Sequence, residues 1–462
     1  MTREIEGMPD ELVELVERLA KQIADHRADN ELRSRYMSGH ALLNRMPFVR
    51  DRAQLEAVVG WPAKAVETLA QRVRFERFTT PEPTSDLDQL AAALRRAQFA
   101  RRVNMGELSA FVHGVSFEVA GVDAAGRPKV THVSALNGTG DYDEVEGKLV
   151  NFLAVSEWDT QDSAVPAAFT LYLPGQVWTV IDGAAVVRSS PIVDGVPVEP
   201  LIYKPDLDRP LGRSRITWPV IFYTQSAMRV IVRSEATADL YSAPSLIALG
   251  VDSQQLQDGS WMQGIGNVVG IPDSDPADAP ENAPNLARAQ IEKIQQASQE
   301  PHIKQLHAWA QLFAGETSIP VSSLGISVEQ ANPNSAEAYA ASREDLISNA
   351  EDAMAEFGAA HVRTVRSAWQ LANRTSEPAE FLAGLSARYR DPRVTSQAAR
   401  ADAFVKLVGA MPALAQTDAA LDMLGLDPEL TERLRSDMRR SRATANILSL
   451  SRLAEDASGS VA

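Results

Sequence analysis

The sequence predicts an α+β protein that is mainly α-helical, in a chain of 462 residues that is long enough for two to four domains. Three changes of pattern predict this class. Apolar residues recur at helical spacing near the N-terminus, the period falls to two from about residue 111, and helical spacing returns from about residue 217. The hydrophobic content of 45% is sufficient for large buried cores.

The first hundred residues are predicted to be mostly helical. Within residues 9–45, apolar side chains repeat at helical steps at Leu12, Leu15, Val16, Leu19 and Ile23. A second helical zone is expected at 54–71, with a break at residues 60–62, and a third helix at 87–106.

Residues 111–193 are predicted to form an antiparallel meander of about six strands. Short β-rich runs alternate there with the turn sequences DAAGRP, PGQ and DG. The aromatic side chains of these runs are expected to form the core of the meander rather than to bind a ligand: Phe117, Phe152, Phe169, Tyr172 and Trp178.

From residue 217 the chain is predicted to be helical with two interruptions. A helix over 217–242 is followed by a small β-containing excursion over 243–285, and a helix over 286–314 is kinked near Pro301. The second interruption, 315–335, has no Lys or Arg in its central part and is longer than most connections between helices, which favours a functional loop. A helix from Ser335 to Asn373, about 58 Å long, follows. Three C-terminal helices are then predicted, in the segment from 378 up to Tyr389, at 394–411 and at 427–455, before a short tail.

Composition and charge exclude several function classes. The formal net charge of −16 and the pI near 5.0 should make the chain repel nucleic acids and anionic membranes. The chain has no cysteine, so thiol nucleophiles, disulfides and cysteine-based zinc sites are excluded. The N-terminus does not resemble a signal peptide and no apolar run reaches 18 residues, so we expect a protein made and folded in a cytoplasm.

Catalytic motifs are not found in the sequence. It has no P-loop and no G-x-S-x-G elbow, and GIGNVVG at 264–270 lacks the spacing of a dinucleotide-binding loop. His302 and His307 are five residues apart, which places them off a common helix face. We therefore predict no catalytic residue and no cofactor.

Two charged segments could suggest ligand binding. The acidic loop with Asp273, Asp275, Asp278 and Glu281 lacks the central glycine and the closing glutamate of a calcium loop, so a solvated loop is favoured over a metal site. The arginine-rich run at 432–442 could contact phosphate, but it also contains acidic residues on a predicted helix, and a solvated face is favoured.

Several motifs resemble those of portal proteins of tailed bacteriophages, in particular siphophages that infect actinobacteria. GRSRITWPVIFYTQSAMRVIVRSEATADLYSAPSLIALG (212–250) looks like the turn, the stem helix and the entry into the clip of that family. TSIPVSSLGI followed by NPNSAEAYAASREDL is similar to its tunnel loop and the start of its long wing helix, and YMSGHALL (36–43) matches its N-terminal region. The resemblance covers about residues 30–375.

The resemblance implies the domain organisation of a portal subunit, which would form a dodecameric ring. The parts would be a wing at 1–216, a stem helix at 217–242, a small α/β clip at 243–285, a second stem helix at 286–314, a tunnel loop at 315–335, a long wing helix at 336–377, and C-terminal wing and crown helices with a tail at 378–462. The modest apolar faces of the two stem helices agree with packing against copies of the same chain, and head-to-tail contacts that close produce a ring.

The resemblance also implies function and partners. The ring would occupy one capsid vertex of the virion, after assembly in the host cytoplasm, and double-stranded DNA would pass through it during packaging and ejection. The terminase large subunit and later the head-tail adaptor would dock on the clip, and the major capsid and scaffolding proteins would also contact the ring. Twelve copies would carry roughly −190 charges, so DNA should slide through the channel with contacts that do not depend on sequence.

Candidate site residues follow from these implied roles. Loop residues at the channel would be Val321, Ser322, Ser323, Leu324 and Ile326. Lys293 and Lys304 are candidates for charges along the channel, and Trp261, Asp273, Asp275 and Asp278 for partner docking at the clip. We expect Leu324 and Ile326 to face DNA or the neighbouring loop. The alternative from another class is a soluble cytoplasmic enzyme with hydrolase-like chemistry, and a large ring or a monomer in solution would distinguish the two.

Overall fold

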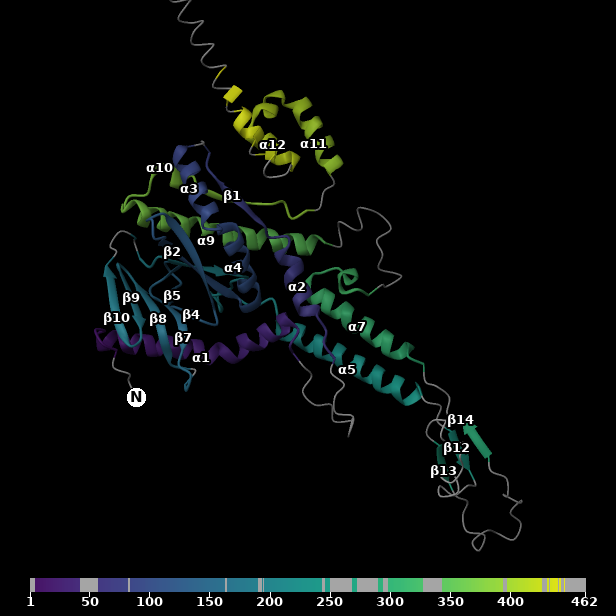
Figure 1. The fold of residues 1–462 in the computed structure, drawn as a ribbon. Coiled ribbons are helices and arrows are strands. Elements are labelled where there is room, and N and C mark those ends of the chain that lie inside the picture. The colour runs from purple at the N-terminus through teal and green to yellow at the C-terminus, as the bar shows by residue number, and fades with distance from the viewer. Residues whose placement is uncertain are drawn as a thin grey trace, which may run out of the picture. The chain divides into compact units, whose positions relative to one another are not determined.

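A computed structural model gives the fold of two compact units, residues 1–392 and 393–462, which are described separately. The described residues are 5–41, 57–81, 84–162, 164–189, 193, 195–242, 246–249, 268–271, 290–293, 298–326, 343–393, 397–425, 430, 431, 433–438, 440, 441 and 444. Among them, helices are the main elements and antiparallel sheets the second, as the sequence predicts (Figure 1).

The region of the predicted meander contributes to two antiparallel sheets instead of one. One has the order β10-β9-β8-β7-β4, with bounds Ala184–Ser189, Gln176–Ile181, Pro166–Leu173, Phe152–Trp158 and Gly138–Thr139. The other has the order β11-β2-β3, with bounds Val198–Ile202, Val115–Val122 and Pro128–Ser134. The short pair β5 and β6 lies at Tyr142–Asp143 and Lys148–Leu149.

The separation into two sheets follows from the burial of β2. Five consecutive residues of this strand are buried, so both of its faces must be covered, which a meander with one solvated face does not provide. Phe117 of β2 and Phe152 of β7 fill the space between the sheets, with ring centroids 4.7 Å apart. Of the predicted core aromatics, Phe117, Phe152 and Phe169 are fully buried, whereas Tyr172 and Trp178 are partly buried against the same clusters.

The N-terminal helices differ from the prediction at their ends. Helix α1, Asp10–Ser38, packs its apolar face on the larger sheet and ends at Gly39 in the left-handed region (φ 73°), before the predicted end at residue 45. Helix α2 spans Trp61–Ala70. The predicted helix at 87–106 is in fact two helices, α3 (Ser85–Arg96) and α4 (Phe99–His113), because Gln98 between them has φ 54°.

Helix α9, Glu344–Asn373, is the long helix predicted before the C-terminal region, and residues 335–342 of the prediction lie outside the described residues. It lies across the smaller sheet, against β2 and β11 (Figure 1). The chain then forms α10 (Glu380–Ala383) and β15 (Ser386–Tyr389) where a helix up to Tyr389 is predicted. Strand β15 pairs antiparallel with β1 (Phe75–Thr79), a strand that the sequence does not reveal.

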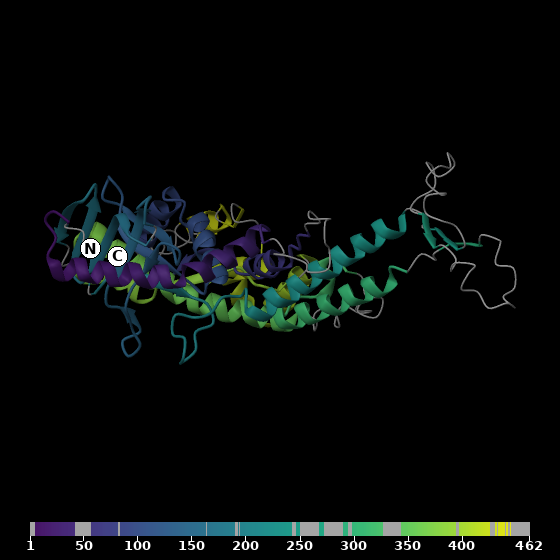
Figure 2. The same ribbon diagram turned by 90° about the horizontal axis from the view of Figure 1, so that it is seen from below.

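Helices α5 (Trp218–Ser242) and α7 (Glu300–Thr317) lie side by side as an antiparallel pair (Figures 1 and 2). The strands that lie between α5 and α7 in sequence form a three-stranded sheet of order β13-β12-β14, with bounds Val268–Ile271, Leu246–Leu249 and Gln290–Lys293. The predicted helix at 286–314 is therefore wrong at its start. Pro301 does not kink it but occupies the first turn of α7, where a missing N–H costs nothing.

The second unit contains α11 (Gln397–Ala410), the 3-10 helix η4 (Pro412–Gln416) and α12 (Asp418–Leu424). The described positions from 430 to 444 are also helical. Helical structure in this region agrees with the prediction from residue 394 onward. Within the part of the chain that the structure describes, we find no helix that combines the length and apolarity of a membrane span.

Candidate functional site: the α5–α7 pair and the segment after it

The turn before α5 is built by the GRSR motif. Gly212 has φ 77°, and a side chain there would collide with the backbone oxygen of Tyr203. Ser214 donates from Oγ to the Val112 carbonyl at 2.5 Å and accepts from the Ile216 N–H at 2.9 Å. These contacts fix the direction in which the chain enters α5.

Arg215 of the same motif is buried and ties three elements together. Its Nε donates to the Ala65 carbonyl of α2 at 2.9 Å. Its Nη1 donates to the Tyr203 hydroxyl at 3.1 Å, and its Nη2 to the Thr317 carbonyl at 2.6 Å. Thr317 is the last residue of α7, so the guanidinium satisfies a carbonyl at the negative end of that helix. A buried charge in this position is stabilised by hydrogen bonds and by the helix dipole.

Polar and aromatic contacts align α5 with α7 along their length. Thr217 donates from Oγ1 to Glu316 at 3.1 Å at one end, and Ser234 donates to Gln299 at 2.9 Å at the other. Between these, the ring of Trp309 lies 5.9 Å from Phe222 and 6.1 Å from Tyr223, measured between centroids. The pair is therefore held in a single register from end to end.

The segment 318–326 continues directly from α7. Ser318 ends the helix in the left-handed region (φ 55°), and the next residue, Ile319, is buried. The 3-10 helix η3, Val321–Leu324, begins after Pro320 and ends at Gly325, which has φ 75°. The chain thus makes a compact turn beside the end of α7.

The structure places the predicted loop residues on different sides of this segment. Leu324 and Ile326 are partly buried and pack against the main hydrophobic cluster of the same chain. Ser322 is exposed, and Val321 and Ser323 are partly exposed. Leu324 and Ile326 therefore have a packing role within the chain itself, and their expected contact with DNA or a neighbouring loop stays a prediction. A role of the segment at the channel stays a prediction.

The two candidate lysines lie in different elements. Lys304 is exposed on α7 and forms an ion pair of 2.7 Å with Glu300, one turn earlier. Lys293 is in β14, where its backbone pairs with Leu246 of β12. Trp261, Asp273, Asp275 and Asp278 lie outside the described residues, as does the remainder of the predicted loop from 327.

Sequence reasoning missed the contribution of Arg215 and a buried polar cluster below α9. The GRSR motif carries only the resemblance to portal proteins. It does not indicate that the side chain of Arg215 contacts residues 65, 203 and 317. The cluster joins Glu107, Glu118, His132, His361 and Tyr389. No local spacing signals it, because its members are spread over more than 280 residues of chain.

Comparisons with known proteins agree with the motif resemblance. A family model described as "Phage portal protein, SPP1 Gp6-like" matches residues 237–417, which include α7, the segment 318–326 and α9. The portal protein of Mycobacterium phage D29 is 27% identical over 367 residues, which cover 77% of this chain and 73% of that protein. The portal protein of Mycobacterium phage L5 is 26% identical over 371 residues, which cover 78% of this chain and 74% of that protein.

The resemblance to phage portal proteins is confirmed. Both relatives come from phages of actinobacteria, as the motifs indicated. A chain of the solved virion of a native gene transfer agent particle is also similar, with a TM-score of 0.44 and 14% identity over 87% of this chain and 94% of that chain, a likeness too distant to support an inference. The portal family is structural, and nothing in these matches indicates catalysis.

Proposed function

We propose that this portal protein assembles into a dodecameric ring at one capsid vertex and forms the channel through which double-stranded DNA is packaged and ejected. The observation that carries the proposal is the similarity to two phage portal proteins over more than three quarters of the chain. The α5–α7 pair supports it, because two long helices held in one register make a rigid wall element.

The proposed division of the chain follows the sequence-based organisation, with one change. The wing would comprise residues 1–216 and the long helix α9, and the stem would comprise α5 and α7. The clip would extend from 243 to about residue 299, because β14 pairs with β12 and belongs with that sheet rather than with the second stem helix. The crown would comprise the C-terminal helices, and the tunnel loop would begin at Ser318, where α7 ends.

We assign the DNA contact to the uncharged turn after α7. A conduit must not retain its cargo, and a ring of chains that each carry −16 charges offers phosphates few favourable contacts. Lys304 is engaged by Glu300 on the same helix, so it would present a neutralised pair rather than a free cation. Contacts with DNA would then be steric and independent of base sequence.

The partners follow from the same role. The terminase large subunit would dock on the clip during packaging and the head-tail adaptor would replace it afterwards. The major capsid protein and the scaffolding protein would surround the wing during assembly in the host cytoplasm. These assignments are supported by the similarity to portal proteins and by the position of β12, β13 and β14 between α5 and α7 in sequence.

The mass of the purified protein in solution tests the proposal. Twelve copies of a 50.2 kDa chain give an assembly of about 600 kDa, which native mass spectrometry or analytical ultracentrifugation resolves from neighbouring ring sizes. Negative-stain images should show rings with a central hole. A monomer or dimer at all concentrations, with no ring in the images, would overturn the proposal.

A further inference from the structure

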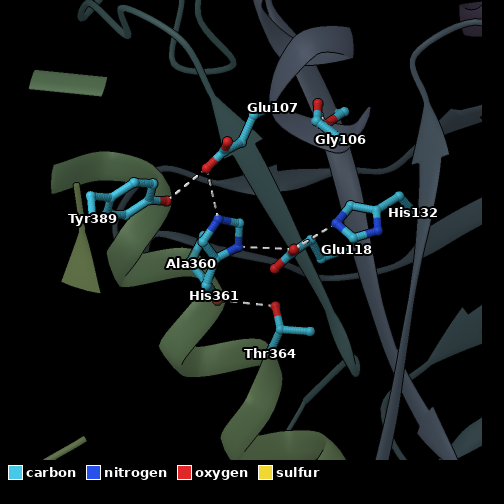
Figure 3. Close-up of polar contacts among 9 residues, drawn as sticks. Gly106, Glu107, Glu118, His132, Ala360, His361, Thr364 and Tyr389 are labelled. Atoms are coloured by element: carbon cyan, nitrogen blue, oxygen red, sulfur yellow. Dashed lines mark hydrogen bonds and ion pairs between the residues drawn. The ribbon is translucent and has the colours of Figure 1, made fainter. Parts of the chain in front are cut away.

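A buried polar cluster lies where α9 meets the smaller sheet (Figure 3). His361 of α9 is at its centre, with Nδ1 2.9 Å from Oε1 of Glu118 on β2 and Nε2 3.2 Å from Oε1 of Glu107 on α4. His132 of β3 reaches the same Glu118 oxygen with Nε2 at 2.7 Å, and Tyr389 of β15 donates its hydroxyl to Glu107 at 2.7 Å. Side chains from five elements therefore meet in one cluster around this histidine.

The contacts define the protonation state of His361. Each of its ring nitrogens faces a carboxylate oxygen, and an ionised carboxylate only accepts hydrogen bonds. With both carboxylates ionised, both nitrogens carry a proton and the side chain is an imidazolium. Burial disfavours this charge, but the carboxylates, with Glu118 the strongest, outweigh the burial and raise the pKa of His361 to about 9. In turn, His361 and His132 outweigh the burial of Glu118 and hold its pKa well below the ordinary range.

The surroundings exclude solvent from this cation. His361 and Glu118 are 0% exposed, and Glu107 is 2% exposed. The rings of Phe75 and Phe99 lie 5.9 and 6.1 Å from the imidazole, measured between centroids. In such surroundings a change of one proton alters the interaction energy far more than at the surface.

Two features distinguish the cluster from a fully satisfied structural anchor. Oε2 of Glu118 and Nδ1 of His132 are buried and have no hydrogen-bond partner among the described residues. A partly satisfied buried network costs more than an apolar core of the same volume, so its presence calls for a role beyond packing. The chain also makes space for it, because a side chain at position 106 would overlap the ring of His132, and this residue is Gly106.

We propose that His361 is a proton-operated lock, which holds α9 against α4 and β2 while its imidazole is doubly protonated and releases the helix when one proton is lost. After that loss, one ring nitrogen presents a lone pair to a carboxylate oxygen, and a hydrogen bond becomes a repulsion between two acceptors. The lock is a property of one protomer and does not rest on ring formation. It would act on the helix that follows the segment after α7.

The other groups around His361 fix the direction of the response. Facing it are Glu107 from α4, Glu118 from β2 and the ring of Tyr389 from β15, and His132 from β3 lies behind Glu118, to which it is hydrogen-bonded. The next charged pair is Glu199 of β11 with Arg363 of α9, joined at 2.8 Å. The carboxylates favour the protonated lock, and Arg363, which lies at an exposed position, already has a carboxylate partner. Release is therefore expected on the alkaline side.

The sign of the pH dependence follows from linkage. The pKa of His361 is higher in the folded chain than its ordinary value of 6.5, so its stabilising effect is complete below about pH 6.5 and is lost as the pH rises to about 9. Above about pH 9, His361 loses its proton within the folded chain, and the lock opens. Opening should appear as local loss of protection in α9 before global unfolding.

Hydrogen exchange of the full-length protein, followed by mass spectrometry and corrected for the intrinsic effect of pH, tests the lock. We expect peptides of α9 and β15 to lose at least tenfold in protection between pH 7 and pH 10, while β8 and β9 keep theirs. In Glu107→Gln one of the two anions is removed, so the midpoint of this loss should fall by about one pH unit, a tenfold lower proton affinity.

His26→Gln is the matched control, because His26 is an exposed histidine of α1 outside the cluster, and this variant should keep the wild-type midpoint. Protection of α9 that falls no more than that of β8 and β9 in the wild type would overturn the proposal. So would an unchanged midpoint in Glu107→Gln. The wild-type measurement decides the matter even where that variant fails to fold.

Discussion

Nη2 of Arg215 donates a hydrogen bond of 2.6 Å to the carbonyl oxygen of Thr317. A side chain from the turn that precedes α5 therefore also holds the last residue of α7. The two residues are 102 positions apart, and strands β12, β13 and β14 lie between them in sequence. One buried guanidinium therefore ties the chain just before α5 to the C-terminal end of α7, directly before the segment that starts at Ser318.

We expect Arg215→Met to destabilise the protein by about 3 kcal/mol, because the carbonyls of Ala65 and Thr317 lose their charged donor while they remain buried. The midpoint of urea unfolding, followed by tryptophan fluorescence, measures this change. Arg213→Met is the matched control, since Arg213 lies two residues away in the same turn and is exposed. Equal midpoints for the two variants would contradict the assigned role of Arg215.

Gly212→Ala should also destabilise the turn, by about 2 kcal/mol or more, because φ 77° is unfavourable for alanine and the new methyl group meets the Tyr203 carbonyl. Gly315→Ala provides a contrast within the same site. A side chain at position 315 meets nothing within 4 Å, and the residue lies inside α7, so the substitution should stabilise by about 0.5–1 kcal/mol. Thermal unfolding by calorimetry should shift in opposite directions for the two variants.

Two aspartate substitutions separate core packing from contact with DNA in the segment after α7. Leu324→Asp should lower the free energy of unfolding by about 2 kcal/mol, because it places a carboxylate against the hydrophobic cluster. Ser322→Asp is at an exposed position and should leave the unfolding midpoint unchanged.

The proposed ring, with this segment at its channel, predicts that Ser322→Asp reduces the fraction of DNA-filled capsids in assembled particles, because the added carboxylates would repel phosphates. Ser322→Asn, of nearly the same shape and without charge, is the control and should fill normally. Electron microscopy of particles gives the filled fraction. Normal filling of the aspartate variant would show that this segment does not form the constriction.

A second histidine predicts a response to acid. His113 accepts or donates at Ser34 Oγ (3.0 Å) and Ser109 Oγ (3.3 Å), and burial lowers its pKa to about 4. Because the unfolded chain binds this proton from about pH 6.5, the folded state loses up to about 3 kcal/mol as the pH falls from 6.5 to 4. His113→Gln should flatten the dependence of the unfolding free energy on pH in this range, whereas His26→Gln should not. If the unfolding free energies of wild type and His113→Gln changed in parallel with pH, this prediction would be contradicted.

The sequence predicts local elements of this fold well and distant pairings poorly. Helices α5 and α9 are long and periodic, and their existence follows from spacing alone. Strands β1 and β15 pair across more than 300 residues, and neither strand is recognisable without the other. The break at Gln98 was missed because a glutamine in the left-handed region has no signature in sequence.

The same limit applies to the candidate site. The motifs around Gly212 and Ile319 carry the resemblance to portal proteins, but they do not reveal the partners of Arg215. Leu324 is uncharged and lies next to a glycine. This local sequence is equally compatible with an exposed turn and with a residue packed against the hydrophobic cluster. His361 and its carboxylates could be joined only by knowing that α4, β2 and α9 meet.

The pairing of β1 with β15 also determines when the first unit can complete its folding during synthesis. Residue 75 leaves the ribosome long before residue 389 exists, so the edge of β1 has no partner until most of the chain has been translated. Likewise, Arg215 cannot form its hydrogen bond to Thr317, and Glu118 cannot form its hydrogen bond to His361, until these later residues have been synthesised. A nascent chain therefore cannot complete the fold of the first unit until residue 389 has been translated, and a chain that stops before this point should leave the edge of β1 unpaired.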